Sequence, residues 1–164
     1  IVGMTFLDQR NQQVRDETAR NIVMSRIGIP MAGISAKMGL GGFKMKMTMA
    51  SKMSTLCNNQ EVMKIFYRDK TSAANSASMR FIDSYGNYQP AMEPEEFNVC
   101  PILLTQPEKD RWTPLHLSTP FLDRMKKVEV KVVNLENGGH FPVEQPALDQ
   151  MLVAIVEFIN KVIN

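Results

Sequence analysis

The last third of the chain carries the pattern that most constrains the fold. CPILLTQ (100–106) and VEVKVVNL (128–135) have the aliphatic, β-branched composition of strands. TPLHLSTPFLDRMKK (113–127) predicts a helix, with Pro114 near the first turn, where a missing N–H costs little. PALDQMLVAIVEFINKVI (146–163) predicts an amphipathic helix. Strands that alternate with helices favour an α/β fold with a parallel sheet covered by helices.

The first two thirds of the chain are organised differently. IVGMTFL (1–7) predicts a further buried strand, and residues 11–28 predict a helix that Pro30 ends or bends. Residues 44–53 alternate Lys and Met at first and then change to a helical pattern. Helices are expected over 60–69 and 72–85, and a Pro- and Gly-rich linker is expected over 86–97.

Composition excludes several classes of function. A net charge of +2 is too small to indicate a nucleic-acid partner. The chain has no run of about 20 apolar residues, so we expect no stable membrane insertion. No basic leader precedes an apolar run, so we expect a cytoplasmic protein. We expect Cys57 and Cys100 to be free thiols, and without CxxC or HxxxH spacing we expect no metal site.

The sequence NGGHFP places His140 on irregular backbone between two regular elements, because the glycines and Pro142 disfavour both helix and strand. Asp110 lies in the loop after the preceding strand. The carboxyl ends of parallel strands meet at one edge of a sheet, so both loops are expected there. Asp110 would then bind one ring nitrogen of His140, and the other nitrogen would take a proton from a nucleophile.

These residues resemble a known family. PILLTQPEKDRWTP, followed by NGGHFPVEQP and a closing apolar helix, resembles the C-terminal part of an α/β-hydrolase-fold protein. Pro107 stands where that family often has glycine. The resemblance implies that Asp110 is the acid of a catalytic triad and that His140 is the base. It also implies three parts: a core strand and connection (1–24), a helical cap (25–95) and the C-terminal part of the core (96–164).

The family's nucleophile is not evident in the sequence. That serine lies in a G-x-S-x-G elbow between a strand and a helix. GISAK, with Ser35 between Gly33 and Ala36, lacks the last glycine and has too little chain before it for the strands that precede an elbow. We therefore expect a fragment or processed chain, starting at Ile1, whose nucleophile lies elsewhere.

Several further residues are candidates for roles around His140. Asp8, at the end of the first strand, is an alternative acid. The pocket candidates are Trp112, Phe141, Met45 and Met49, the methionines because a pliable apolar cap suits acyl groups. His116 lies within a predicted helix and is expected to be structural.

The leading hypothesis is a serine hydrolase of carboxylic esters, including lipid-like ones, with a small ester or acyl substrate and no cofactor. The chain is expected to associate with itself or with the missing N-terminal half. One alternative is that the chain is a non-catalytic binding or interaction module, or that it belongs to a longer protein that has lost its nucleophile. Another is dehalogenase or C–C hydrolase chemistry on the same fold.

Overall fold

The chain forms two compact units, one built on a sheet of apolar strands and one built mainly from short helices. The computed structural model describes residues 1–163. The sheet unit comprises Ile1–Asp8, Cys57–Asn59 and Pro90–Asn164, and the helical unit comprises Gln9–Leu56 and Gln60–Gln89. The predicted division into a core strand and connection (1–24), a cap (25–95) and a C-terminal core part (96–164) stays a prediction.

The sheet unit contains three parallel strands in the order β1-β4-β5. They are β1 (Val2–Gly3), β4 (Ile102–Pro107) and β5 (Val130–Leu135). All six residues of β4 are buried, as expected of a central strand whose side chains pack on both faces of the sheet. The chain therefore has the α/β architecture that the alternating pattern predicted, although β1 is much shorter than residues 1–7.

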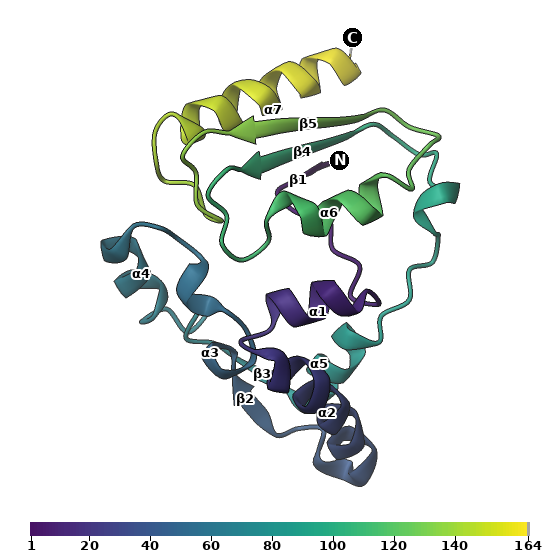
Figure 1. The fold of residues 1–164 in the computed structure, drawn as a ribbon, viewed down its shortest axis with the longest axis vertical. Coiled ribbons are helices and arrows are strands. Elements are labelled where there is room, and N and C mark those ends of the chain that lie inside the picture. Colours follow the sequence, from purple (N-terminus) through teal and green to yellow (C-terminus); the bar gives the residue numbers. More distant parts are fainter. Residues whose placement is uncertain (164) are drawn as a thin grey trace. The chain divides into compact units, whose positions relative to one another are not determined.

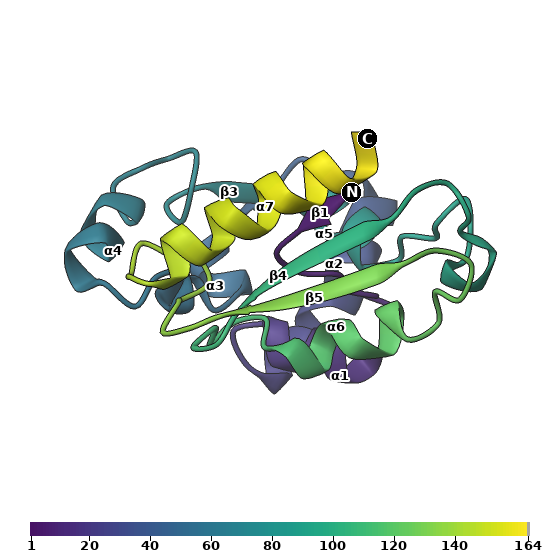
Figure 2. The same ribbon diagram turned by 90° about the horizontal axis from the view of Figure 1, so that it is seen from above.

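One helix covers each face of this sheet (Figures 1 and 2). On one face, α6 (Leu115–Leu122) packs Leu122 against Ile102 and Leu104. On the other, α7 (Ala147–Ile163) packs Ala154 and Phe158 against Leu103. The short 3-10 helix η4 (Pro94–Glu96) precedes β4, and Phe97 after it joins the α6 side of the core. Cys57 and Cys100 are both free thiols.

The helical unit consists mainly of short helices. Their bounds are α1 (Gln12–Thr18), η1 (Met24–Gly28), α2 (Ile29–Ser35), η2 (Ala36–Leu40), α3 (Met47–Ala50), η3 (Met53–Thr55), α4 (Gln60–Phe66) and α5 (Met79–Gly86). An antiparallel pair, β2 (Lys44–Lys46) with β3 (Ser76–Ser78), forms a separate small sheet. Neither strand joins β1, β4 and β5.

Two predictions in this unit were wrong. Ser76–Ser78 is a strand and not part of a helix over 72–85, because these residues pair with β2 before Ser78 caps α5. Pro30 does not end a helix: η1, α2 and η2 follow one another directly. The N–H of Ile29 donates to the carbonyl of Met24, five residues back, and this wider π turn gives the proline ring room.

The buried strand β4 provides a test of this architecture. Leu104→Ala should lower the free energy of unfolding by about 2–5 kcal/mol, because it leaves a cavity between β4 and α6. Val132→Ala, at an exposed position of β5, should change it by less than about 1 kcal/mol. Urea unfolding of the two variants measures the difference, and equal losses would contradict the assigned core.

Candidate active site

The loops after β4 and β5 are held together beyond the last strand residues. The N–H of Glu108 donates to the carbonyl of Leu135, and the N–H of Lys109 donates to the carbonyl of Gly138, each at 2.9 Å. The N–H of Asn137 donates to the Glu108 carboxylate at 2.9 Å. The two loops therefore start as a continuation of the β4–β5 ladder.

The Gly138-Gly139 pair allows the close packing that this arrangement needs. A Cβ on Gly138 would lie 2.9 Å from the Cβ of Ala147, and one on Gly139 would lie 2.9 Å from Nδ2 of Asn58. The positive φ of this turn, 62°, falls on Asn137, a residue type that tolerates it. Glycine is needed at these two positions because a side chain would not fit there, and not because the backbone has an unusual conformation.

His140 and Asp110 form a buried hydrogen-bonded pair. Nδ1 of His140 lies 2.9 Å from Oδ2 of Asp110, and the side chains are 11% and 0% exposed. An ionised carboxylate only accepts, so Nδ1 carries a hydrogen, and in the neutral form of the imidazole the lone pair is on Nε2. The sequence prediction that these side chains meet within hydrogen-bonding distance is confirmed.

Thr113 adds a third member, which the sequence analysis missed. Its hydroxyl donates to Oδ2 of Asp110 at 2.8 Å and lies 3.0 Å from Nδ1 of His140. The backbone N–H groups of Trp112 and Thr113 both donate to Oδ1 at 2.8 Å. The available signal was the Asp-x-x-Thr spacing before a helix, which is typical of a side chain that binds the backbone two and three residues ahead.

The environment of Asp110 favours its charged form. Burial alone would raise the pKa of this carboxyl group, but the hydrogen bonds from His140 and the Thr113 N–H, with the charge of the imidazolium, outweigh burial. The net result is a pKa below the usual value. A carboxylate held in this state can orient His140 and stabilise its protonated form.

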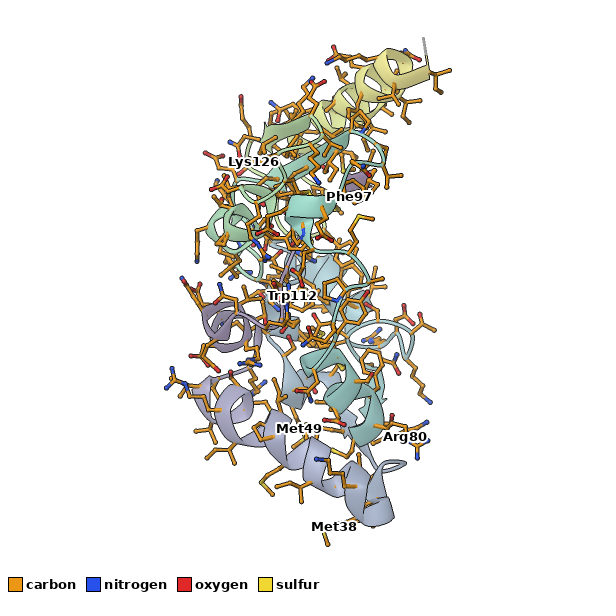
Figure 3. All side chains as sticks on the ribbon, turned by 90° about the vertical axis from the view of Figure 1, so that its right-hand side faces the viewer. Met38, Met49, Arg80, Phe97, Trp112 and Lys126 are labelled. Atoms are coloured by element: carbon orange, nitrogen blue, oxygen red, sulfur yellow. The ribbon has the colours of Figure 1, made fainter. Side chains whose placement is uncertain are left out.

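Two aromatic rings flank the imidazole. The ring centroid of Trp112 lies 4.8 Å from that of His140, and the centroid of Phe141 lies 5.4 Å away, both in edge-to-face arrangements. Figure 3 labels Trp112 on the loop after β4. Both predicted pocket residues from this unit therefore contact the candidate base.

The other predicted residues lie elsewhere. Asp8 lies 3.6 Å from Nη1 of Arg124, so the carboxylate bound to His140 is Asp110. Ser35 ends α2 with helical backbone on both sides, so it is not on a strand-to-helix elbow. Met45 lies in β2 and Met49 in α3, both in the helical unit, and their role in a pocket stays a prediction.

His116 lies within α6. Among residues 1–163 no three His, Cys, Asp or Glu side chains are grouped so that they could hold a metal ion.

A solved structure resembles this chain. The crystal structure of Paleococcus ferrophilus monoacylglycerol lipase superposes with a TM-score of 0.62 at 19% sequence identity, over 81% of this chain and 51% of that one. This chain has part of an α/β-hydrolase fold. It spans about half the length of the solved lipase. No protein-family model matches the sequence, and no curated protein matches it.

Asp110 should make the stability of this partial hydrolase fold depend on pH. A carboxyl group whose pKa is lower in the folded state contributes stability above its unfolded pKa of about 3.9, and that stability is lost as the pH falls through the folded pKa. The unfolding free energy of Asp110→Asn should therefore fall less below about pH 4 than that of the original chain does. Asp149→Asn, an exposed carboxylate on α7, controls for the change in charge. An unchanged acid profile in Asp110→Asn would contradict the assignment.

The Thr113 hydroxyl should contribute to stability through its bond to Asp110. Thr113→Val keeps the volume but removes that donor, and we expect a loss of about 1–3 kcal/mol in the free energy of unfolding. Thr113→Ser keeps the hydroxyl and should lose about 1 kcal/mol or less. A smaller loss in Thr113→Val than in Thr113→Ser, measured by denaturant unfolding, would show that the methyl group and not the hydroxyl is what matters.

Proposed function

We propose that this chain is the C-terminal part of an α/β-hydrolase that cleaves carboxylic esters, with His140 as general base and Asp110 as its orienting acid. The observation that carries the proposal is the 2.9 Å contact between His140 Nδ1 and Asp110 Oδ2 at the carboxyl ends of β4 and β5. Asp110 is ionised there and has donors on both oxygens, so the imidazole is held in one tautomer.

The proposed reaction uses the free Nε2 of His140. A serine outside this chain attacks the acyl carbon of the ester while Nε2 takes its proton. The resulting imidazolium, stabilised by Asp110, returns that proton to the leaving alcohol as the C–O bond breaks. Nε2 then takes a proton from a water molecule as its oxygen attacks the acyl carbon. The bond between that carbon and the serine oxygen breaks, the imidazolium returns the proton to the serine, and the acid leaves. Thr113 positions Asp110 in each step through its bond to Oδ2.

The surroundings of the pair favour an apolar acyl substrate. Trp112 and Phe141 contact the imidazole, and Phe141 is 42% exposed, which leaves an aromatic surface beside the base. The resembling structure is a monoacylglycerol lipase, and a lipid-like ester is consistent with these residues. In this proposal the helical unit is the cap, and Met45 and Met49 line its acyl-binding side.

The other half of the proposed enzyme would pack on the sheet unit. In the described part of the chain, β1 pairs on one side with β4 and forms the edge of the sheet. The outer side of α7 carries exposed aliphatic residues, namely Leu148, Leu152, Val153, Val156, Ile159, Val162 and Ile163. An open strand edge beside an apolar helix face is suited to the missing half, and in its absence to a second copy.

Activity is the direct test of the function. This chain alone should not hydrolyse a short-chain aryl ester at an enzymatic rate, because a histidine–aspartate pair without a nucleophile and oxyanion donors offers only general-base help of about 10²–10⁴-fold. In a longer polypeptide that supplies the nucleophile, His140→Ala should lower the rate about 10³-fold or more. Robust turnover by the chain alone, abolished by His140→Ala, would place the nucleophile within these residues and make Ser35 the first serine to replace. Full activity of His140→Ala in the longer polypeptide would refute the proposal.

Association is the test of the missing half. The purified chain should sediment above its monomer mass of 18.6 kDa, because burying the α7 face removes apolar surface from water. Leu152→Lys combined with Val156→Lys should shift it towards the monomer. Ile65→Lys, an equally exposed isoleucine on α4, is the matched control and should leave the mass unchanged. A strictly monomeric chain would contradict the open face.

A further inference from the structure

The helical segment of η1, α2 and η2 exposes large apolar side chains to solvent and buries small residues. Five large apolar residues between positions 22 and 40, which recur every three or four positions, lie on the exposed side and are between 53% and 72% exposed. We name them the outward stripe: Val23, Ile27, Met31, Ile34 and Met38. The buried positions of the same segment are the small residues Ser25, Ala32 and Gly33. Figure 3 shows Met38 pointing away from the ribbon at the far end of the segment.

Close packing between α2 and α5 fixes this orientation. A Cβ on Gly33 would lie 2.6 Å from Oδ1 of Asp83, and one on Gly86 of α5 would lie 2.8 Å from Cγ2 of Ile29. At Gly33, α2 has no room for a side chain while Asp83 keeps its place. At Gly86, the missing side chain of α5 makes room for Ile29 of α2. This packing favours burial of Ala32 and Gly33 and leaves the stripe on the exposed side.

The stripe lies in a strongly basic part of the chain. No acidic residue occurs between Glu17 and Glu61, whereas six cations do: Arg20, Arg26, Lys37, Lys44, Lys46 and Lys52. The helical unit as a whole has 12 basic and 5 acidic residues, a net charge of +7. The sheet unit has 7 basic and 12 acidic residues, a net charge of −5, so the overall +2 conceals opposite charges on the two units.

We propose that the outward stripe is a docking face for the surface of a lipid bilayer that contains anionic lipids. A helix that lies in the plane of the interface has an apolar face for the acyl boundary and flanking Lys and Arg for the headgroups. The stripe supplies the first, and Lys37, Lys44 and Lys46, all exposed, supply the second. None of the described helices is both long and apolar enough to cross a bilayer, so the contact is with its surface.

The charges favour a lipid surface over a second copy of this chain as the occupant. Two helical units that met through the stripe would bring two net charges of +7 together, and that repulsion opposes association. An anionic membrane attracts the same residues. The proposal does not depend on the catalytic role of His140.

Vesicle co-sedimentation of the purified chain tests this proposal. Vesicles of phosphatidylcholine with phosphatidylserine should bind the chain, binding should weaken as salt is raised, and phosphatidylcholine alone should bind it more weakly. Ile27→Gln, Met31→Gln and Ile34→Gln combined should lower the affinity at least about tenfold. Lys37→Gln, Lys44→Gln and Lys46→Gln combined should lower it about tenfold or more and remove most of the salt dependence.

The matched control changes the other exposed apolar face. Leu152→Gln with Val156→Gln removes aliphatic side chains from α7, in the unit with a net charge of −5, and should lower vesicle binding much less than the stripe variant does, whatever its effect on the solution mass. Every replaced residue is exposed to solvent. We therefore expect circular dichroism to show that all variants are folded. Binding that is absent in the original chain, or equal in the stripe and α7 variants, would overturn the proposal. A fall in solution mass caused by the stripe variants, without vesicle binding by the original chain, would identify a protein contact instead and would also overturn it.

Discussion

The parallel ladder between β4 and β5 is the constraint on which the candidate site depends. Its register runs from Ile102 with Val130 to Pro107 with Leu135, and the bonds from Glu108 and Lys109 extend it into the loops. A shift of one residue would send alternate side chains to the wrong face and would separate the two loops. Asp110 meets His140 because the sheet is in this register.

Burial and hydrogen bonding act against each other at Asp110, and hydrogen bonding prevails. A carboxylate with 0% side-chain exposure is costly unless donors replace the water that it loses. Here the loop backbone supplies two donors, and the side chains of Thr113 and His140 supply the others. The loop after β4 thus stabilises the charge that orients His140.

The two units differ in how they use apolar residues. In the sheet unit, aliphatic side chains of β4 are buried between α6 and α7, and the exposed ones gather on the outer side of α7. In the helical unit, glycines allow α2 to approach α5 closely, and large side chains are left outside. The opposite net charges, −5 and +7, mean that these two exposed surfaces suit different partners.

The sequence by itself determined the alternation of strands and helices after residue 100 and the loop positions of Asp110 and His140, because periodicity and the placement of Gly and Pro are local properties. The spacing of Thr113 was visible, but its contact with both partners depends on how the two loops meet. Pairing decided that Ser76–Ser78 is a strand, and a π turn decided that Pro30 lies within a helical segment.

The tertiary structure alone decided which face of the residue 22–40 segment is buried. The periodic apolar residues mark an amphipathic helix, and such a stripe usually faces the core. Here a Cβ on Gly33 would meet Asp83 of α5, and Gly86 of α5 makes room for Ile29, so the face with the small residues turns inward. A sequence pattern gives the two faces of a helix, but the space available at the contact with a neighbour determines which of them meets water.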